Sequence, residues 1–71
     1  MNRIAVISEV LCSVGYDLDQ RMLEIEFVSG DIYCYFDVPD ELHVALMGAE
    51  SHGGFFATHI RDAGFEYQKI E

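Results

Sequence analysis

The central part of the chain alternates between apolar and acidic residues. Leu23, Ile25 and Phe27 are separated by Glu24 and Glu26. A period of two is typical of a β-strand that buries one side and exposes the other. The segment therefore predicts a strand whose apolar side faces the core and whose two carboxylates face water.

The residues after this strand predict a β-hairpin. Ser29 and Gly30 supply the turn, because glycine tolerates the positive φ that tight hairpins need. A two-residue loop pairs Phe27 with Ile32 and turns every second residue of 32–36 toward the core. That register leaves four side chains together on the outer, solvent-facing side of the sheet: Tyr33, Tyr35, Glu24 and Glu26.

Further strands are expected on both sides of the hairpin. Residues 11–16 predict another strand, whose facing the sequence leaves open. If Tyr16 lies opposite Leu23, then Val14 lies opposite Ile25 and Cys12 opposite Phe27. Residues 3–8 either extend that strand or form another one at the edge of the sheet. The alternation after residue 64 is weak, so the end of the chain is either a loose tail or an added strand.

Two short helices should follow the sheet. Pro39 suits the first position of a helix, and apolar residues then recur at helical spacing as far as Ala49. The Gly-Gly pair at 53–54 interrupts the pattern, and a second helix with Ser51 as its N-cap should close at Gly64. We expect an α+β fold, an antiparallel meander of about three to four strands with two helices packed on one face.

The two cysteines lie in apolar, strand-like segments. Cys12 and Cys34 are expected to be buried on strands separated by a third strand, about 9–10 Å apart. Bridged cysteines need Cα atoms within about 7 Å, so no disulfide is predicted. Two reduced thiols are typical of a cytoplasmic protein.

Size and charge narrow the function. The chain has 71 residues, which allows one small domain with few apolar side chains left over for a deep pocket. Thirteen acidic residues against four basic ones give a net charge of −9, the reverse of what nucleic acids or anionic membranes attract. No spacing of histidines and cysteines indicates a metal or cofactor site. We therefore expect no enzyme activity, no membrane association and no small-molecule substrate.

The two tyrosines are the most distinctive candidate site. Tyr33 and Tyr35 lie two residues apart on one strand, with Glu24 and Glu26 across from them in the predicted register. Tyrosine offers contact area and a hydroxyl at small entropic cost. We expect a non-catalytic binding module that contacts a protein partner or a second copy of the chain. Aromatics on an open sheet also stack RNA bases, but the adjacent carboxylates disfavour that alternative.

The order of these segments resembles the KTSC domain family, which is named after the C-terminus of some lysyl-tRNA synthetases and includes small free-standing bacterial proteins. Four stretches and the later Ile60 carry the resemblance: Ser13-Val14-Gly15-Tyr16-Asp17, Leu23-x-Ile25-x-Phe27, Tyr33-x-Tyr35-Phe36-x-Val38-Pro39 and Leu46-x-x-Ala49-x-Ser51-x-Gly53-x-Phe55-Phe56. It spans about residues 3–62 and implies a single domain over 1–71, with 64–71 as the tail or added strand. RNA or tRNA binding is the role suggested for the family.

The resemblance adds Ser51 and Gly53 to the candidate binding residues. The family commonly has basic or polar residues after this serine and this glycine, whereas this chain has His52 and Gly54. These departures fall in the segment best placed to touch an anion. They weaken the expectation of RNA binding for this member.

Overall fold

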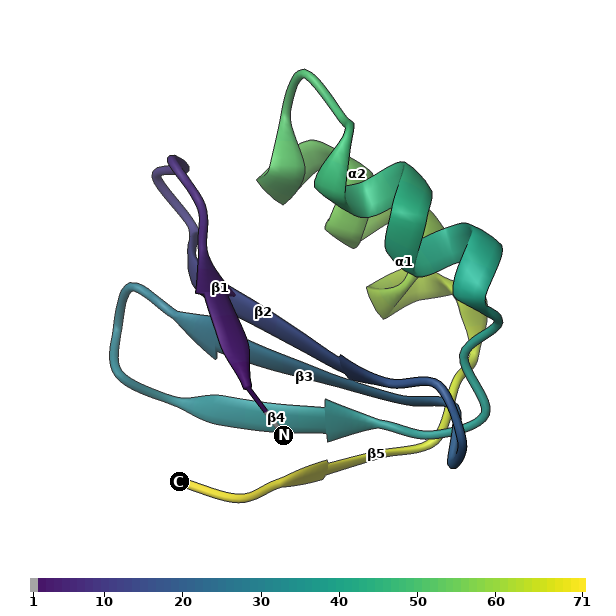
Figure 1. Ribbon diagram of the computed structural model, residues 1–71. Coiled ribbons are helices and arrows are strands. Elements are labelled where there is room, and N and C mark those ends of the chain that lie inside the picture. The colour runs from purple at the N-terminus through teal and green to yellow at the C-terminus, as the bar shows by residue number, and fades with distance from the viewer. Residues whose placement is uncertain (1) are drawn as a thin grey trace.

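The computed structural model describes residues 2–71 and has an α+β architecture (Figure 1). Five antiparallel strands form one sheet in the order β1-β2-β3-β4-β5, and both helices lie on the same side of it. The elements are β1 (Arg3–Ala5), β2 (Leu11–Asp17), β3 (Met22–Phe27), β4 (Ile32–Tyr35), α1 (Asp40–Met47), α2 (His52–His59), a 3₁₀ turn (Arg61–Ala63) and β5 (Tyr67–Lys69).

The predicted meander is confirmed, and it has more strands than expected. The start of the chain forms a separate edge strand, β1, paired with β2. The end of the chain forms β5, in which Tyr67 lies opposite Tyr35 of β4. Because β5 pairs with the free edge of β4, β4 is an internal strand of the sheet.

The predicted register of the central hairpin is wrong by one residue. Ile25 lies opposite Tyr33 and Leu23 opposite Tyr35, whereas a two-residue loop would pair Phe27 with Ile32. The loop has three residues, 28–30, and is closed by the Phe27 N–H, which donates to the Asp31 carbonyl at 2.9 Å. Its last residue, Gly30, has φ 99°, the left-handed conformation that ends the common three-residue hairpin loop.

This shift exchanges the two faces of β4. Tyr33 and Tyr35 share the helix-covered side with Leu23 and Ile25, so the expected solvent-facing pair of tyrosines does not exist. Tyr35 is only 5 % exposed, and Tyr33 is half-buried. The outer side of β4 carries the residues expected to point inward, and Ile32 and Cys34 are nevertheless buried there.

The pairing of β2 is confirmed over most of its length and fails at its start. Val14 lies opposite Ile25, as predicted. A bulge between Leu11 and Ser13 places Leu11, rather than Cys12, opposite Phe27. Cys12 is therefore exposed, contrary to the expectation that both thiols are buried. Both cysteines are free, as predicted.

The helices follow their sequence signals closely. Pro39 precedes α1, and the Ser51 hydroxyl caps α2 by accepting from the Gly54 N–H at 3.1 Å. The Gly-Gly pair at 53–54, expected to be an inter-helix turn, lies inside the first turn of α2. A 3₁₀ turn extends the second helical segment as far as Gly64.

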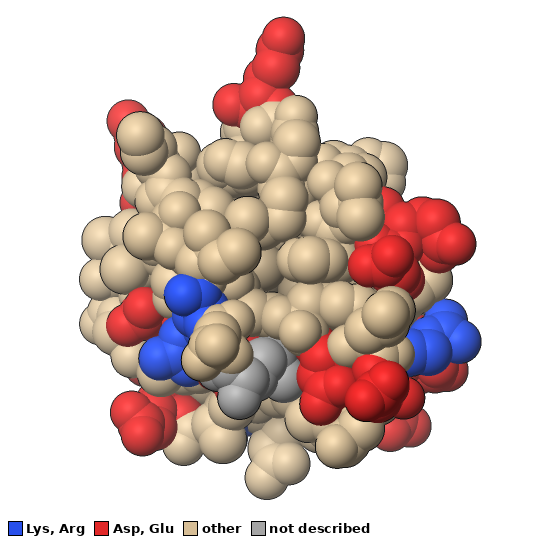
Figure 2. All heavy atoms as spheres, in the orientation of Figure 1, with Lys and Arg blue, Asp and Glu red and all other residues tan. Residues whose placement is uncertain are grey.

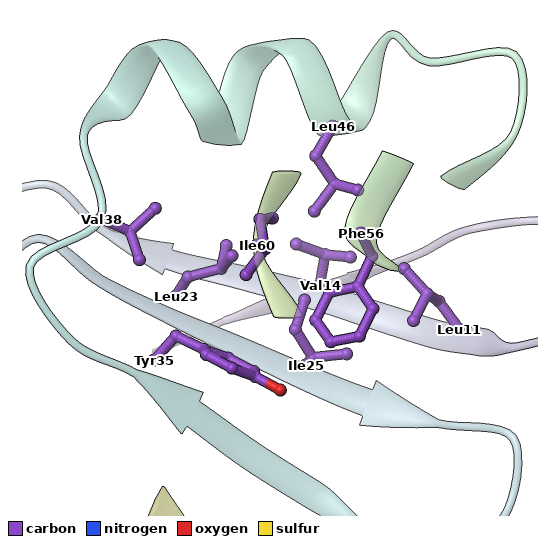
Figure 3. Packing of buried hydrophobic residues seen from close by; sticks show 9 residues of the cluster. All are labelled: Leu11, Val14, Leu23, Ile25, Tyr35, Val38, Leu46, Phe56 and Ile60. Atoms are coloured by element: carbon purple, nitrogen blue, oxygen red, sulfur yellow. The ribbon is translucent and has the colours of Figure 1, made fainter. Parts of the chain in front are cut away.

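The core lies between the sheet and the helices (Figure 3). The sheet contributes Leu23, Ile25 and Tyr35 from its inner side, and Phe56 of α2 packs over them. Val38 lies in the connection to α1 and is fully buried. The Tyr16 hydroxyl donates to the Val38 carbonyl at 2.5 Å, which fixes this connection against β2.

Candidate binding groove

An open groove of about 760 Å³ runs between α2 and the inner face of the sheet at β3, β4 and β5. The hairpin loop 28–30 and the loop before β2 lie together at one end of it, where the Val28 N–H donates to the Val10 carbonyl at 2.9 Å, and β4 and β5 form one wall. Five aromatic residues line it: Phe27, Tyr33, Tyr35, Phe56 and Tyr67. A volume of this size lies within the range of ligand-binding sites in proteins.

The aromatic rings touch one another and form a continuous floor. Tyr67 lies 5.7 Å from Tyr33 and 5.5 Å from Tyr35, measured between ring centroids. Phe56 meets Tyr35 edge to face at 5.5 Å, and Phe27 meets Tyr33 in the same way at 5.7 Å. These distances leave no room for a ligand between the rings, so an occupant would lie on top of them.

The exposed fraction of the tyrosine side chains increases across this floor, from the core to the rim. Tyr35 belongs to the core, and burial raises the pKa of its phenol. Tyr67 is 61 % exposed, and the nearby rim residues Val28 and Val10 are 60 % and 48 % exposed. The groove therefore keeps apolar surface in contact with water beside a well-packed core, as interaction sites commonly do.

Charged side chains stand around the groove, and most of them are paired. The Lys69 ammonium lies 3.4 Å from the Asp31 carboxylate, and the Arg61 guanidinium donates to Asp62 at 3.1 Å. Glu9 also lines the groove, and within residues 2–71 its carboxylate has neither an ion pair nor a hydrogen bond. The uncompensated charge at the groove is therefore negative.

The predicted carboxylates Glu24 and Glu26 lie on the opposite, outer face of the sheet. Glu24 forms an ion pair with Arg3. Glu26 accepts a hydrogen bond from the Ser13 hydroxyl at 2.7 Å, and this bond, with a second one from the Cys12 thiol, lowers the pKa of Glu26. These contacts hold both carboxylates against the outer face of the sheet, on the side opposite the tyrosines.

Gly53 lines the groove from α2, whereas Ser51 lies outside its lining. Ser51 serves as the helix cap, and Gly53 lines both the groove and a smaller adjoining hollow of about 250 Å³. A Cβ at position 53 would lie 3.1 Å from Val10 Cγ2. Any larger residue would displace the Val10 side chain by a few tenths of an ångström, so glycine allows the loop before β2 to approach the helix this closely.

The structure brings together only part of the predicted site. Tyr33, Tyr35 and Gly53 line one groove, whereas Glu24 and Glu26 do not reach it. The sequence interpretation missed the ten other lining residues, among them Glu9, Phe56 and Tyr67. The alternation of Phe65 and Tyr67 in the tail was the available signal for an additional aromatic strand, but its weakness did not separate a strand from a loose end.

Residues 2–71 contain neither a metal site nor a membrane-spanning helix. No group of three or more His, Cys, Asp or Glu side chains in this range is arranged to hold a metal ion. No helix in it combines the length and apolar character needed to cross a bilayer.

Comparisons with known proteins agree with the resemblance seen in the sequence. Residues 7–65 match the KTSC domain. An uncharacterised protein of Stutzerimonas stutzeri is 41 % identical over 71 residues, the full length of both chains. A protein of Tsukamurella paurometabola is 38 % identical over 48 residues, covering 68 % of this chain and 72 % of its own.

A solved structure extends the likeness to three dimensions. The crystal structure of a KTSC domain protein from Yersinia pestis superimposes with a TM-score of 0.93 at 41 % identity, covering 99 % of this chain and 97 % of that one. The family match spans most of the sheet and both helices. This chain belongs to the KTSC domain family.

Proposed function

We propose that this chain is a non-catalytic binding module that holds a protein partner in the aromatic groove. The observation that carries the proposal is the graded tyrosine floor, in which Tyr35 belongs to the core while Tyr67 stays 61 % exposed beside it. A rigid floor of this kind presents contact area without ordering flexible side chains, which lowers the entropic cost of association.

The chemistry around the groove supports a binding role rather than a catalytic one. Its charged lining residues in the described part of the chain are Glu9, Asp31 and Arg61, and no histidine or cysteine of that part lines it. Two of these three charges are engaged in surface ion pairs. We place the module in the cytoplasm, where the free thiols of Cys12 and Cys34 stay reduced.

Charge favours a different protein over RNA or a second copy of the chain. The net charge of −9 opposes both a phosphate backbone and an identical acidic surface. Figure 2 shows acidic side chains in several groups around the edge of one face, with smaller basic areas between them. The two basic residues nearest the groove, Arg61 and Lys69, are each paired with a carboxylate.

Selection from a phage-displayed library of short random peptides tests the proposal. Peptides enriched on the wild-type chain should lose about tenfold or more in affinity for Tyr67→Ala, whose exposed side chain can be removed without opening the core. Val28→Ser, on the opposite rim, provides a second groove variant. Circular dichroism of both variants confirms that they remain folded.

Four results would overturn the proposal. The first is an absence of enrichment, and the second is enrichment of peptides that bind Tyr67→Ala and Val28→Ser as well as the wild type. The third is tight binding of transfer RNA at about 50 mM salt, which would favour the RNA alternative. The fourth is sedimentation of the free chain as a stable dimer, which would favour self-association in its place.

A further inference from the structure

The unpaired carboxylate of Glu9 makes the groove more favourable for a cationic ligand than for an anionic one. Glu9 lines both the aromatic groove and the smaller hollow beside the start of α2. That hollow adds Glu50, a second exposed carboxylate with no ion pair within residues 2–71. One end of the groove is thus acidic, and the aromatic floor begins next to it.

The aromatic floor favours the same sign of ligand charge. The face of an aromatic ring carries the negative part of its quadrupole and attracts ammonium and guanidinium groups. Tyr33 and Tyr67 are the accessible tyrosines of the floor. A guanidinium lying on either ring would keep part of its surface in water, which reduces the cost of removing it from solvent.

The start of α2 does not reverse this preference. A helix N-terminus attracts anions, but the Ser51 hydroxyl already accepts from the Gly54 N–H. Glu9 and Glu50 line the same hollow and would repel a phosphate or a carboxylate. The charge of the whole chain, −9, acts in the same direction at longer range and steers a cationic partner toward the surface.

We propose that the groove binds an extended, arginine-containing basic segment of the partner protein, with one guanidinium beside Glu9 and another on the ring of Tyr33 or Tyr67. This inference rests on the proposed function, because it names the occupant of the same groove. Extended rather than helical chain fits a site in which the rings form a floor instead of a deep hydrophobic slot.

Two synthetic peptides that differ only in charge test the inference. One carries arginine alternating with tyrosine, glycine and proline, and its twin carries glutamate in place of every arginine. Fluorescence anisotropy should show the arginine peptide binding at least about tenfold more tightly, with the difference shrinking as salt rises. Amide shifts of Val28, Tyr33, Gly53 and Tyr67 in ¹⁵N spectra should locate the peptide in the groove.

A matched pair of substitutions separates the local carboxylate from the overall charge. Glu9→Gln should weaken the arginine peptide about threefold to fivefold. Asp19→Asn removes the same charge from the turn between β2 and β3, at the opposite end of the sheet from the hairpin loop. It should change the affinity by much less than Glu9→Gln.

The outcomes distinguish failure of the inference from failure of the proposed function. Equal affinity for the two peptides, with Tyr67→Ala weakening both, overturns the basic occupant and leaves the groove as the binding site. The inference is also overturned if Glu9→Gln and Asp19→Asn have equal effects, or if neither peptide shifts the groove amides. Binding of single-stranded oligouridylate in preference to the arginine peptide overturns both proposals.

Discussion

The two faces of the sheet around β3 and β4 differ in whether their side chains already have partners. On the outer face, Glu24 and Glu26 are each held by a neighbour on β1 or β2. On the inner face, the tyrosines continue past the edge of the helical cover, so Tyr67 remains in water while Tyr35 is buried. The face without helices has its acidic groups engaged, and the helix-covered face has the open groove.

This contrast shows why a bare sheet face is a poor guide to a binding site here. The outer face lacks a helix, but its polar groups already have partners, which leaves them little to gain from a ligand. The groove lies between α2, which contributes Gly53 and Phe56, and the strands β4 and β5, which contribute the tyrosines. Apolar contact area and the unpaired carboxylate of Glu9 are available together in this groove.

The largest expected difference within the inner face is between Tyr35 and Tyr67. Tyr35→Ala should lower the free energy of unfolding by about 3 kcal/mol or more, because it removes a nearly fully buried ring from the core. Tyr67→Ala should cost less than about 1 kcal/mol, since this ring is mostly exposed. Urea denaturation followed by circular dichroism measures both.

Comparable losses from these two substitutions would contradict the grading of the floor. They would mean that Tyr67 contributes to the core as much as Tyr35 does. Removing both predicted site residues, Tyr33 and Tyr35, is consequently no clean test of binding, because the second substitution unfolds much of the protein.

The hairpin loop should be the next most sensitive feature, because it sets which side chains reach each face. Gly30→Ala is expected to cost about 1 kcal/mol: φ is 99° there, and an added Cβ meets no atom within 4 Å, so the loss comes from the backbone alone. Gly48→Ala, where φ is −93°, should be near neutral. Urea denaturation of both variants, read as the change in midpoint, tests this pair.

A two-residue type I′ loop would need a positive φ at Ser29 as well as at Gly30, and in the structure only Gly30 of these two residues has one. Equal effects of the Gly30 and Gly48 substitutions would contradict this positive φ and so count against the three-residue loop. They would also reopen the assignment of the tyrosines to the inner face.

The sequence predicted the elements better than their facing, and the reason lies in β4. Alternation fixed the inner side of β3, because Leu23, Ile25 and Phe27 alternate with glutamates. No such contrast exists in 32–36, where both alternating sets are apolar enough to be buried. Ile32 and Tyr35 are in fact both buried, on opposite faces, because β5 makes β4 an internal strand.

The length of the hairpin loop therefore had to decide which side chains of β4 point toward the core. Ser29-Gly30 fits both a two-residue loop and the end of a three-residue loop. The cap of α2 was predictable because Ser51 acts through a local contact, whereas Pro39, expected at the first position of α1, lies one residue before it. The groove was not predictable, because it requires Tyr67 and Arg61 to meet residues more than twenty positions earlier in the chain.

On the outer face, the Ser13–Glu26 hydrogen bond should make stability depend on acidity. The bond lowers the pKa of Glu26 in the folded state. Its stabilising contribution is therefore complete above the ordinary carboxyl pKa of 4.5 and is lost as the pH falls through that value and the lower folded one. Ser13→Ala should flatten the fall of the urea midpoint between about pH 6 and pH 3.

Thr58→Ala is the control for this experiment. It also removes a hydroxyl, but from an exposed position on α2. Its urea midpoint should fall with acid as steeply as that of the wild type. An equally steep fall in Ser13→Ala would mean that the hydroxyl does not hold the carboxylate.

The smallest expected effect concerns the exposed thiol on the same face. The hydrogen bond and negative charge of Glu26 raise the pKa of Cys12, so less of it is thiolate near neutral pH, and alkylation by iodoacetamide should be slow for an exposed cysteine. Glu26→Gln should accelerate modification of Cys12 several-fold, as followed by mass spectrometry of the digested protein.

Glu24→Gln removes a carboxylate from the same face. It separates the effect of the Glu26–Cys12 contact from the effect of the overall negative charge of that face. Glu24 is paired with Arg3 and acts on the pKa of Cys34, where burial is the larger cause of the increase. Cys12 should therefore react at the wild-type rate in Glu24→Gln. Equal acceleration by both substitutions would make the outer face a general acidic surface, and it would then compete with the groove for a basic partner.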